Sequence, residues 1–106
     1  MQNIKALYII VNAGFSESAI EIARNCGATG GTVFSARGTG HHKKEHKSLF
    51  HFEPEKEIII CLVTEEVANK VMDVIKEVAG VDSPVNGICF MLPVDKMTSL
   101  NKQDIE

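Results

Sequence analysis

Four short apolar runs divide the chain, and each is too short to form a helix. They occupy residues 6–11, 32–36, 57–63 and 87–94. The second run, TVFSA, is short and rich in residues that favour strands, whereas the other three are apolar at nearly every position. Continuous apolar runs of this length are typical of strands that are buried on both faces or lie at the centre of a sheet. We therefore predict four strands.

Two segments between these runs carry apolar residues at helical spacing. The first extends from a capping Ser16 to Gly27, and the second extends from a capping Thr64 to Gly80. Serine and threonine favour the start of a helix, and glycine favours its end. The glycine pair at 30–31 predicts a tight connection that needs flexible backbone angles.

The resulting order is strand, helix, strand, strand, helix, strand, which is the split βαβ arrangement of a ferredoxin-like sandwich. We predict an α+β fold of this βαββαβ type, with an antiparallel four-stranded sheet and a single domain over residues 1–106. The helices of such a fold cover one face of the sheet only. Because the strands are apolar throughout, the other face needs cover as well, and a partner subunit would supply it. We therefore expect a homo-oligomer.

Composition removes several classes of function. The net charge is −3, whereas general nucleic-acid binders carry a positive excess, so we expect no nucleic-acid partner. No stretch approaches the roughly 18 apolar residues that a membrane span requires. The N-terminal stretch MQNIKALYIIV lacks a small-residue cleavage site and is interpreted as a strand rather than a signal peptide, which favours a cytoplasmic location.

The three cysteines, Cys26, Cys61 and Cys89, form no CxxC pair. Two of them lie inside apolar runs, so we interpret them as reduced, buried thiols that pack as small hydrophobic side chains. A zinc site built on them would need ligand spacings that this sequence lacks.

The stretch RGTGHHKKEHKSLFHFEPEK, residues 37–56, differs from the rest of the chain because it is polar and basic and holds all four histidines. Imidazole is a common ligand of zinc, copper and nickel, and short histidine-rich tracts can bind such metals. The alternative is a solvated loop whose histidines have no shared role. The candidate divalent-metal ligands are His41, His42, His46 and His51.

The same stretch also carries positive charge and apolar side chains. Arg37 and three lysines oppose a single acid, Glu45, and could dock an acidic partner surface or phosphate, although a solvated charge run is the alternative. Its apolar side chains either fold back on the scaffold or anchor in a partner. Ser48 lies near histidines without a nucleophile elbow or an acid to orient a base, so we predict that the chain is not an enzyme. The lysines are Lys43, Lys44 and Lys47, and the apolar residues are Leu49, Phe50 and Phe52.

Two longer stretches together resemble the PII signal-transduction family. The stretch FSESAIEIARNCGATGGTVFSARGTG, residues 15–40, resembles the family's first helix, its glycine–threonine turn, its second strand and the Gly-x-Gly at the base of its long T-loop. The stretches KEIIICLVTEEVANKVMDVIKEV and NGICFMLPVDKM resemble the third strand, second helix and fourth strand. The resemblance covers about residues 4–98, in order and without insertions.

The resemblance implies a PII-like homotrimer that binds a small effector, such as ATP, ADP or AMP, in clefts between subunits. It also implies a T-loop at about residues 38–56, through which the protein would control a membrane transporter or a metabolic enzyme, and a polar tail at about residues 95–106. A metal-responsive trimer that uses the histidine-rich loop is the alternative, because CutA-like proteins linked to divalent metals have the same fold. Carried over position by position, the nucleotide contacts are Ile10, Thr32, Gly38, Gly40, Leu62 and Gly87.

Several positions that carry charge in the family differ here. The T-loop is shorter, and the histidine pair at 41–42 stands where the family has a glutamine that helps to hold metal and 2-oxoglutarate. Ile88 stands where the family has a phosphate-binding lysine, and the family's two arginines fall on or near Ser99 and Asn101. We therefore expect a PII-like scaffold that binds a triphosphate more weakly.

Overall fold

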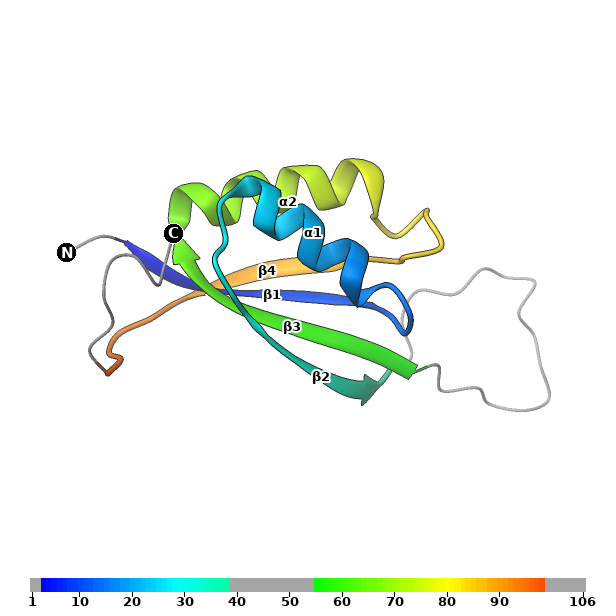
Figure 1. Ribbon diagram of the computed structural model, residues 1–106, viewed down its shortest axis with the longest axis horizontal. Coiled ribbons are helices and arrows are strands. Elements are labelled where there is room, and N and C mark those ends of the chain that lie inside the picture. The colour runs from blue at the N-terminus through cyan, green and yellow to red at the C-terminus, as the bar shows by residue number, and fades with distance from the viewer. Residues whose placement is uncertain (1–2, 39–54, 99–106) are drawn as a thin grey trace.

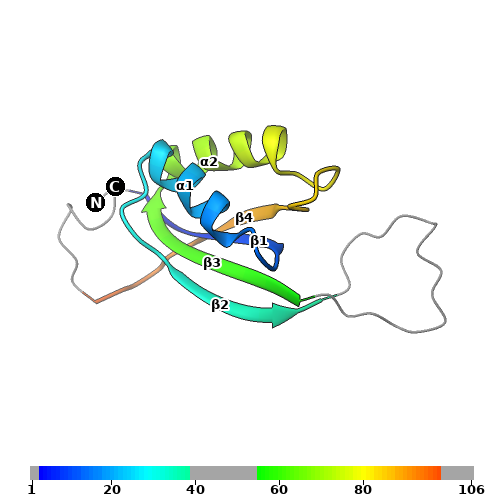
Figure 2. The ribbon, with the colours of Figure 1, turned by 45° about the vertical axis from the view of Figure 1, so that its right-hand side comes forward.

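The computed structural model describes residues 3–38 and 55–98. In Figure 1 the sheet forms one layer, and both helices form a second layer on the same face of the sheet. Figure 2 shows the same two layers from a second direction. The predicted βαββαβ order is confirmed. The elements are β1 (Ile4–Asn12), α1 (Ser16–Cys26), β2 (Thr32–Arg37), β3 (Glu55–Thr64), α2 (Glu65–Val78) and β4 (Ile88–Pro93).

The four strands form one antiparallel sheet, as predicted, and their order in the sheet is β2-β3-β1-β4. The two central strands are longer than the sequence indicated, since β1 begins at Ile4 and β3 begins at Glu55, two residues before the predicted start in each case. The connection between β2 and β3 therefore spans residues 38–54. Among the described residues, no helix is long and apolar enough to cross a membrane.

The core lies between the sheet and the two helices. Along β1 from Leu7 onward, every second side chain faces the helices and is fully buried, and the register places matching residues of β3 beside them. These residues pack against the apolar stripe of α2. The buried set comprises Leu7, Ile9 and Val11 of β1, Ile59, Cys61 and Val63 of β3, and Ala68, Val71 and Ile75 of α2.

The opposite face of the sheet is also apolar but has no helix over it, which confirms the prediction of an uncovered apolar face. The ring of Tyr8 on β1 stacks on that of Phe90 on β4, with centroids 5.0 Å apart and planes 7° from parallel. We call this surface the open face. Its most exposed large side chains are Phe34 (43% exposed), Ile88 (42%), Phe90 (39%) and Leu92 (46%).

The predicted end of α1 and the predicted start of α2 are confirmed. Gly27 follows α1 with φ of 121°, a conformation that favours glycine, so it ends the helix as predicted. Thr64 caps α2, because its Oγ1 accepts a hydrogen bond of 3.3 Å from the Val67 amide. The second helix ends at Val78, before the Gly80 that was expected to stop it.

Two other local predictions are wrong. Ser16 does not cap α1, because it is already the first helical residue and Phe15 occupies the cap position without a side-chain hydrogen bond. The glycine pair at 30–31 has no positive φ angle, so flexible backbone angles do not explain it. Gly31 lies in close packing instead, since a Cβ there would lie 3.1 Å from the sulfur of Cys61 and would require a small shift of its neighbours.

Candidate functional site

Three segments meet at the end of the sheet where β1 stops. The turn after β1, the start of β3 and the loop between α2 and β4 lie at the same end of the molecule (Figure 1). The backbone amide of Asn12 donates a hydrogen bond of 2.9 Å to the carbonyl of Val85, and the backbone amide of Ala13 donates one of 3.0 Å to the carbonyl of Glu55. These bonds hold the loop before β4 and the base of the 38–54 connection against the same turn.

A side-chain pair reinforces this junction. Lys56 is only 6% exposed, and its Nζ donates a hydrogen bond of 2.7 Å to Oδ1 of Asn12. The amide nitrogen of Asn12 donates a hydrogen bond of 2.9 Å to the carbonyl of Pro84. Because a buried ammonium group is costly without polar partners, the side chain of Asn12 has a defined orientation. The side chain of Asn12 accepts a hydrogen bond from Lys56 through its oxygen and donates one to the loop through its nitrogen.

The register places this pair on the open face. Asn12 lies opposite Lys56, two positions beyond the facing isoleucines Ile10 and Ile58. Gly38 is adjacent, since a Cβ built on it would lie 3.8 Å from Cγ of Lys56. The apolar open face therefore ends in the half-buried amide of Asn12 and the buried ammonium of Lys56. An anion that entered at this end would lie near the positive charge of Lys56.

The next residue of β3 acts on the other face of the sheet. One carboxylate oxygen of Glu57 accepts hydrogen bonds from the amides of Gly14 (3.0 Å) and Ser16 (3.2 Å). The first amides of a helix lack partners within the helix, and a negative charge there is favourable. Glu57 therefore supplies from the sheet the cap that the sequence assigned to Ser16.

The structure distributes the predicted nucleotide contacts over both edges of the sheet. Thr32 and Gly38 belong to the β2 edge, whereas Gly87 immediately precedes β4 at the other edge. Ile10 and Leu62 lie on the two central strands, and Ile10 pairs with the β4 residue that follows Gly87. One chain thus brings Ile10 beside Gly87 but leaves the contacts on β2 and β4 separated by the two central strands.

Gly87 has a packing role that the sequence did not reveal. Its amide donates a hydrogen bond of 2.7 Å to the carbonyl of Ala79, and a Cβ at this position would lie 2.5 Å from the same oxygen. No side chain fits in that space. Glycine at this position lets the loop before β4 return closely against the end of α2.

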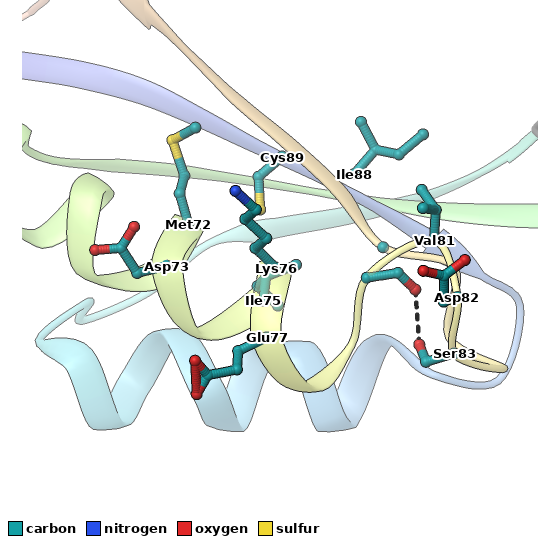
Figure 3. A pocket seen from close by; sticks show the side chains of 12 residues that line it. Met72, Asp73, Ile75, Lys76, Glu77, Val81, Asp82, Ser83, Ile88 and Cys89 are labelled. Atoms are coloured by element: carbon teal, nitrogen blue, oxygen red, sulfur yellow. Dashed lines mark hydrogen bonds between the residues drawn. The ribbon is translucent and has the colours of Figure 1, made fainter.

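A groove of about 660 Å³ lies along β4, between α2 and the following loop. In Figure 3, Met72 and Lys76 extend from α2 toward Cys89 on β4, and Ser83 bonds the backbone at the turn. Three carboxylates and one ammonium line the groove, so its charge disfavours a polyphosphate. The charged lining residues are Asp73, Lys76, Glu77 and Asp82.

The thiols inside the fold are not activated. All three cysteines are free, and burial raises the pKa of Cys89, which lines the groove, to about 11. Burial also raises the pKa of Cys61 in the core. A thiol is a nucleophile only as the thiolate, so both side chains pack as small hydrophobic groups at neutral pH. The prediction of a buried thiol is confirmed for Cys61, whereas Cys89 is half-buried.

The predicted metal ligands lie outside the described residues. These residues are His41, His42, His46 and His51, and Gly40 lies there with them. Within residues 3–38 and 55–98, no group of three histidine, cysteine or acidic side chains gathers to hold a metal ion. Metal binding by the histidine-rich loop stays a prediction.

The sequence did not single out Asn12, Lys56 and Glu57, which the structure brings together at one end of the sheet. Asn12 lies just beyond the first apolar run, and Lys56 lies at the end of the polar stretch 37–56. A signal was nevertheless present, because counting back in twos from Ile60 through Ile58 places Lys56 on the open face. The contact with Asn12, 44 residues away, needed the strand register.

Comparison with known proteins agrees with this architecture. The family model described as nitrogen regulatory protein P-II matches residues 4–104. A PII-like signalling protein from Thermus thermophilus is similar in structure, with 22% identity, a TM-score of 0.67 and 88% of each chain covered. CPII from Thiomonas intermedia, bound to ADP and bicarbonate, has 22% identity and a TM-score of 0.64, with 86% of this chain and 85% of CPII covered.

A third similar structure is the complex of B. subtilis GlnK with ATP, with 19% identity and a TM-score of 0.62. It covers 88% of this chain and 85% of GlnK. No curated protein matches the chain. At these identities, the similar structures establish the fold.

Proposed function

This chain belongs to the nitrogen regulatory protein P-II family, and we propose that it is a homotrimeric regulator that binds an adenine nucleotide between its subunits. The observation that carries the proposal is the open face, which is apolar along the sheet and ends in the hydrogen-bonded pair of Asn12 and Lys56. Nucleotide binding at this end changes the 38–54 connection. That connection then contacts a target protein, either a membrane transporter or a metabolic enzyme.

The distribution of the predicted contacts supports assembly in a ring. Thr32 and Gly38 lie at one edge of the sheet and Gly87 at the other, so they meet only if β2 of one subunit approaches β4 of the next. Such a contact joins two different surfaces, and repeated contacts of this kind close into a ring. A ring of three subunits would also cover the exposed aromatic side chains of the open face.

The nucleotide is proposed from the similar structures and from the charges beside β4. CPII was solved with ADP, AMP and bicarbonate, and GlnK with ATP. In this chain Ile88 stands at the start of β4, and the adjoining groove carries more carboxylates than ammonium groups. These features favour AMP or ADP over ATP. A cytoplasmic location is part of the proposal, because such nucleotides are abundant there.

Calorimetric titration of the full chain with AMP, ADP and ATP tests the nucleotide. We expect one AMP or ADP per subunit, with weaker binding of ATP. The Ile88→Lys variant adds a cation at the start of β4 and should shift the preference toward ATP. The control is Val78→Lys, which adds the same charge at a 59% exposed position on α2. If no nucleotide binds at millimolar concentration, the proposal is wrong.

The target is tested with a variant whose connection is shortened by removing residues 41–52. The shortened protein should keep nucleotide binding and lose the nucleotide-dependent capture of its target from solubilised membranes and cytosol. Capture that persists without these residues would show that another surface contacts the target.

A further inference from the structure

We propose that Asn12 is a positioning residue that couples the loop between α2 and β4 to the base of the 38–54 connection. The proposal deepens the proposed function, on which it rests for its biological meaning, because it states how an effector site would be linked to a signalling loop. The coupling itself is a property of the chain without any ligand.

The first half of the link joins Asn12 to the loop. Its side-chain amide donates to the carbonyl of Pro84 at 2.9 Å, and its backbone amide donates to the carbonyl of Val85 at the same distance. Two adjacent carbonyls of the loop are therefore fixed by one residue of β1. A displacement of the loop must break or stretch both bonds.

The second half joins Asn12 to β3. Its Oδ1 accepts from the ammonium of Lys56 at 2.7 Å, and the neighbouring Ala13 amide donates to the carbonyl of Glu55 at 3.0 Å. These residues begin β3 and therefore end the 38–54 connection. The start of β3 is tied to the turn through backbone and side chain together.

A third tie makes the turn rigid. Glu57 accepts hydrogen bonds from the amides of Gly14 and Ser16, so three consecutive residues of β3 hold residues 12–16. The start of β3 consequently cannot shift without moving the turn or the first residue of α1. The turn is then a stiff element between two loops.

The burial of Lys56 gives the link its strength. A hydrogen bond to a charged group contributes more than one between neutral groups, and a buried ammonium that loses a partner is penalised. If the loop withdraws from Asn12, the amide loses the contact that orients its oxygen toward the lysine. Release of one segment therefore weakens the hold on the other.

Substitutions separate the two halves. Asn12→Asp keeps an acceptor for Lys56 but removes the donor to Pro84, whereas Lys56→Met removes the ammonium and leaves the donor. Substitution of a residue that only stabilises its surroundings would change the hydrogen-exchange rates of nearby amides. Substitution of a coupling residue would also change the exchange rates of amides in the other segment, which the substituted group does not contact.

Hydrogen exchange of the full chain without ligand provides the measurement. The probes are the amides of Asn86 and Gly87, which bond to the carbonyls of Ser83 and Ala79. We expect Lys56→Met to accelerate their exchange by at least about threefold, the coupling of a linked pair. In the Asn12→Asp background, the same lysine substitution should accelerate exchange less, since the side-chain link to Pro84 is already cut and only the backbone bond to Val85 remains.

The control is Lys5→Met, the same chemical change on β1 at the end of the strand near Glu65. It should leave the exchange of Asn86 and Gly87 unchanged. Equal acceleration by Lys5→Met would mean that global stability is being measured, and acceleration confined to residues 12–16 and 55–57 would mean a purely local role. Either result overturns the proposal.

Hydrogen exchange in the presence of AMP distinguishes a failure of the coupling from a failure of the proposed function. If AMP binds, it should slow exchange at both Ala13 and Asn86 in the unmodified chain, but only at Asn86 in Asn12→Ala. Equal slowing in both proteins would overturn the coupling while leaving the function intact. If no nucleotide binds, the proposed function fails, and the exchange data without ligand still decide the coupling.

Discussion

The two faces of this sheet are built from the same kinds of residue, yet only one of them is covered by other elements of the same chain. Ile9 and Ile10 are neighbours on β1, and both face isoleucines on β3. Ile9 is completely buried beneath the helices, whereas Ile10 lies on the open face and stays partly exposed. The apolar residue types therefore indicate that both faces should be buried. The position of the helices decides which face is left exposed in a single chain.

Replacement of these neighbours gives the largest contrast. Ile9→Ala leaves a cavity in a closed core, so we expect the free energy of unfolding to fall by about 2–5 kcal/mol at any protein concentration. Ile10→Ala should cost less in the isolated chain and should show a loss that varies with protein concentration, because its cover comes from another subunit. Urea unfolding at two concentrations measures both. Equal losses independent of concentration would contradict the contrast.

A charge on the open face should break the assembly without unfolding the chain. Phe90→Asp places a carboxylate beside Tyr8 in the proposed interface, and we expect association to weaken by at least about 100-fold. Val78→Asp, at an exposed apolar site on α2, is the matched control and should leave the mass unchanged. Light scattering gives the mass, and circular dichroism checks the fold. An unchanged trimer in Phe90→Asp would argue that the open face is not the interface.

The helices that cover the other face begin in two different ways. Thr64→Ala removes a side-chain cap and should lower the free energy of unfolding by about 1 kcal/mol. Ser16→Ala should change it by less than about 0.5 kcal/mol, because Glu57 caps that helix instead. Denaturant titrations compare the pair. A larger loss in Ser16→Ala would mean that its hydroxyl has a role in the cap after all.

The covered face should also show a shallow dependence on pH. Burial raises the pKa of Cys89 to about 11 from its usual value of 9.0, so the unfolded chain loses this proton first. Unfolding is therefore favoured as pH rises, and stability should decline between about pH 9 and 11. Thermal unfolding of Cys89→Ala against the unmodified chain isolates the effect, since the variant should decline less. Identical slopes would indicate that the thiol is hydrated in the folded chain.

Much of the architecture followed from local patterns. The apolar runs predicted four strands, and Thr64 and Gly27 predicted helix ends that the structure confirms. Each of these depends on residues a few positions apart, so the sequence contains the necessary information. The prediction for Ser16 was wrong for the same reason. Serine favours a cap position, but Ser16 is the first residue of the helix, and Glu57 of β3 caps that helix instead.

By itself the sequence determined the order of elements, the apolar character of both sheet faces and the resemblance to the P-II family. The tertiary structure decided which face the helices cover, and it joined Asn12 to Lys56 and Pro84, 44 and 72 positions away. These contacts depend on strand register and loop path, which result from the packing of the whole chain. Periodicity and capping are local properties, whereas the hydrogen bond between Asn12 and Lys56 forms only when distant segments meet.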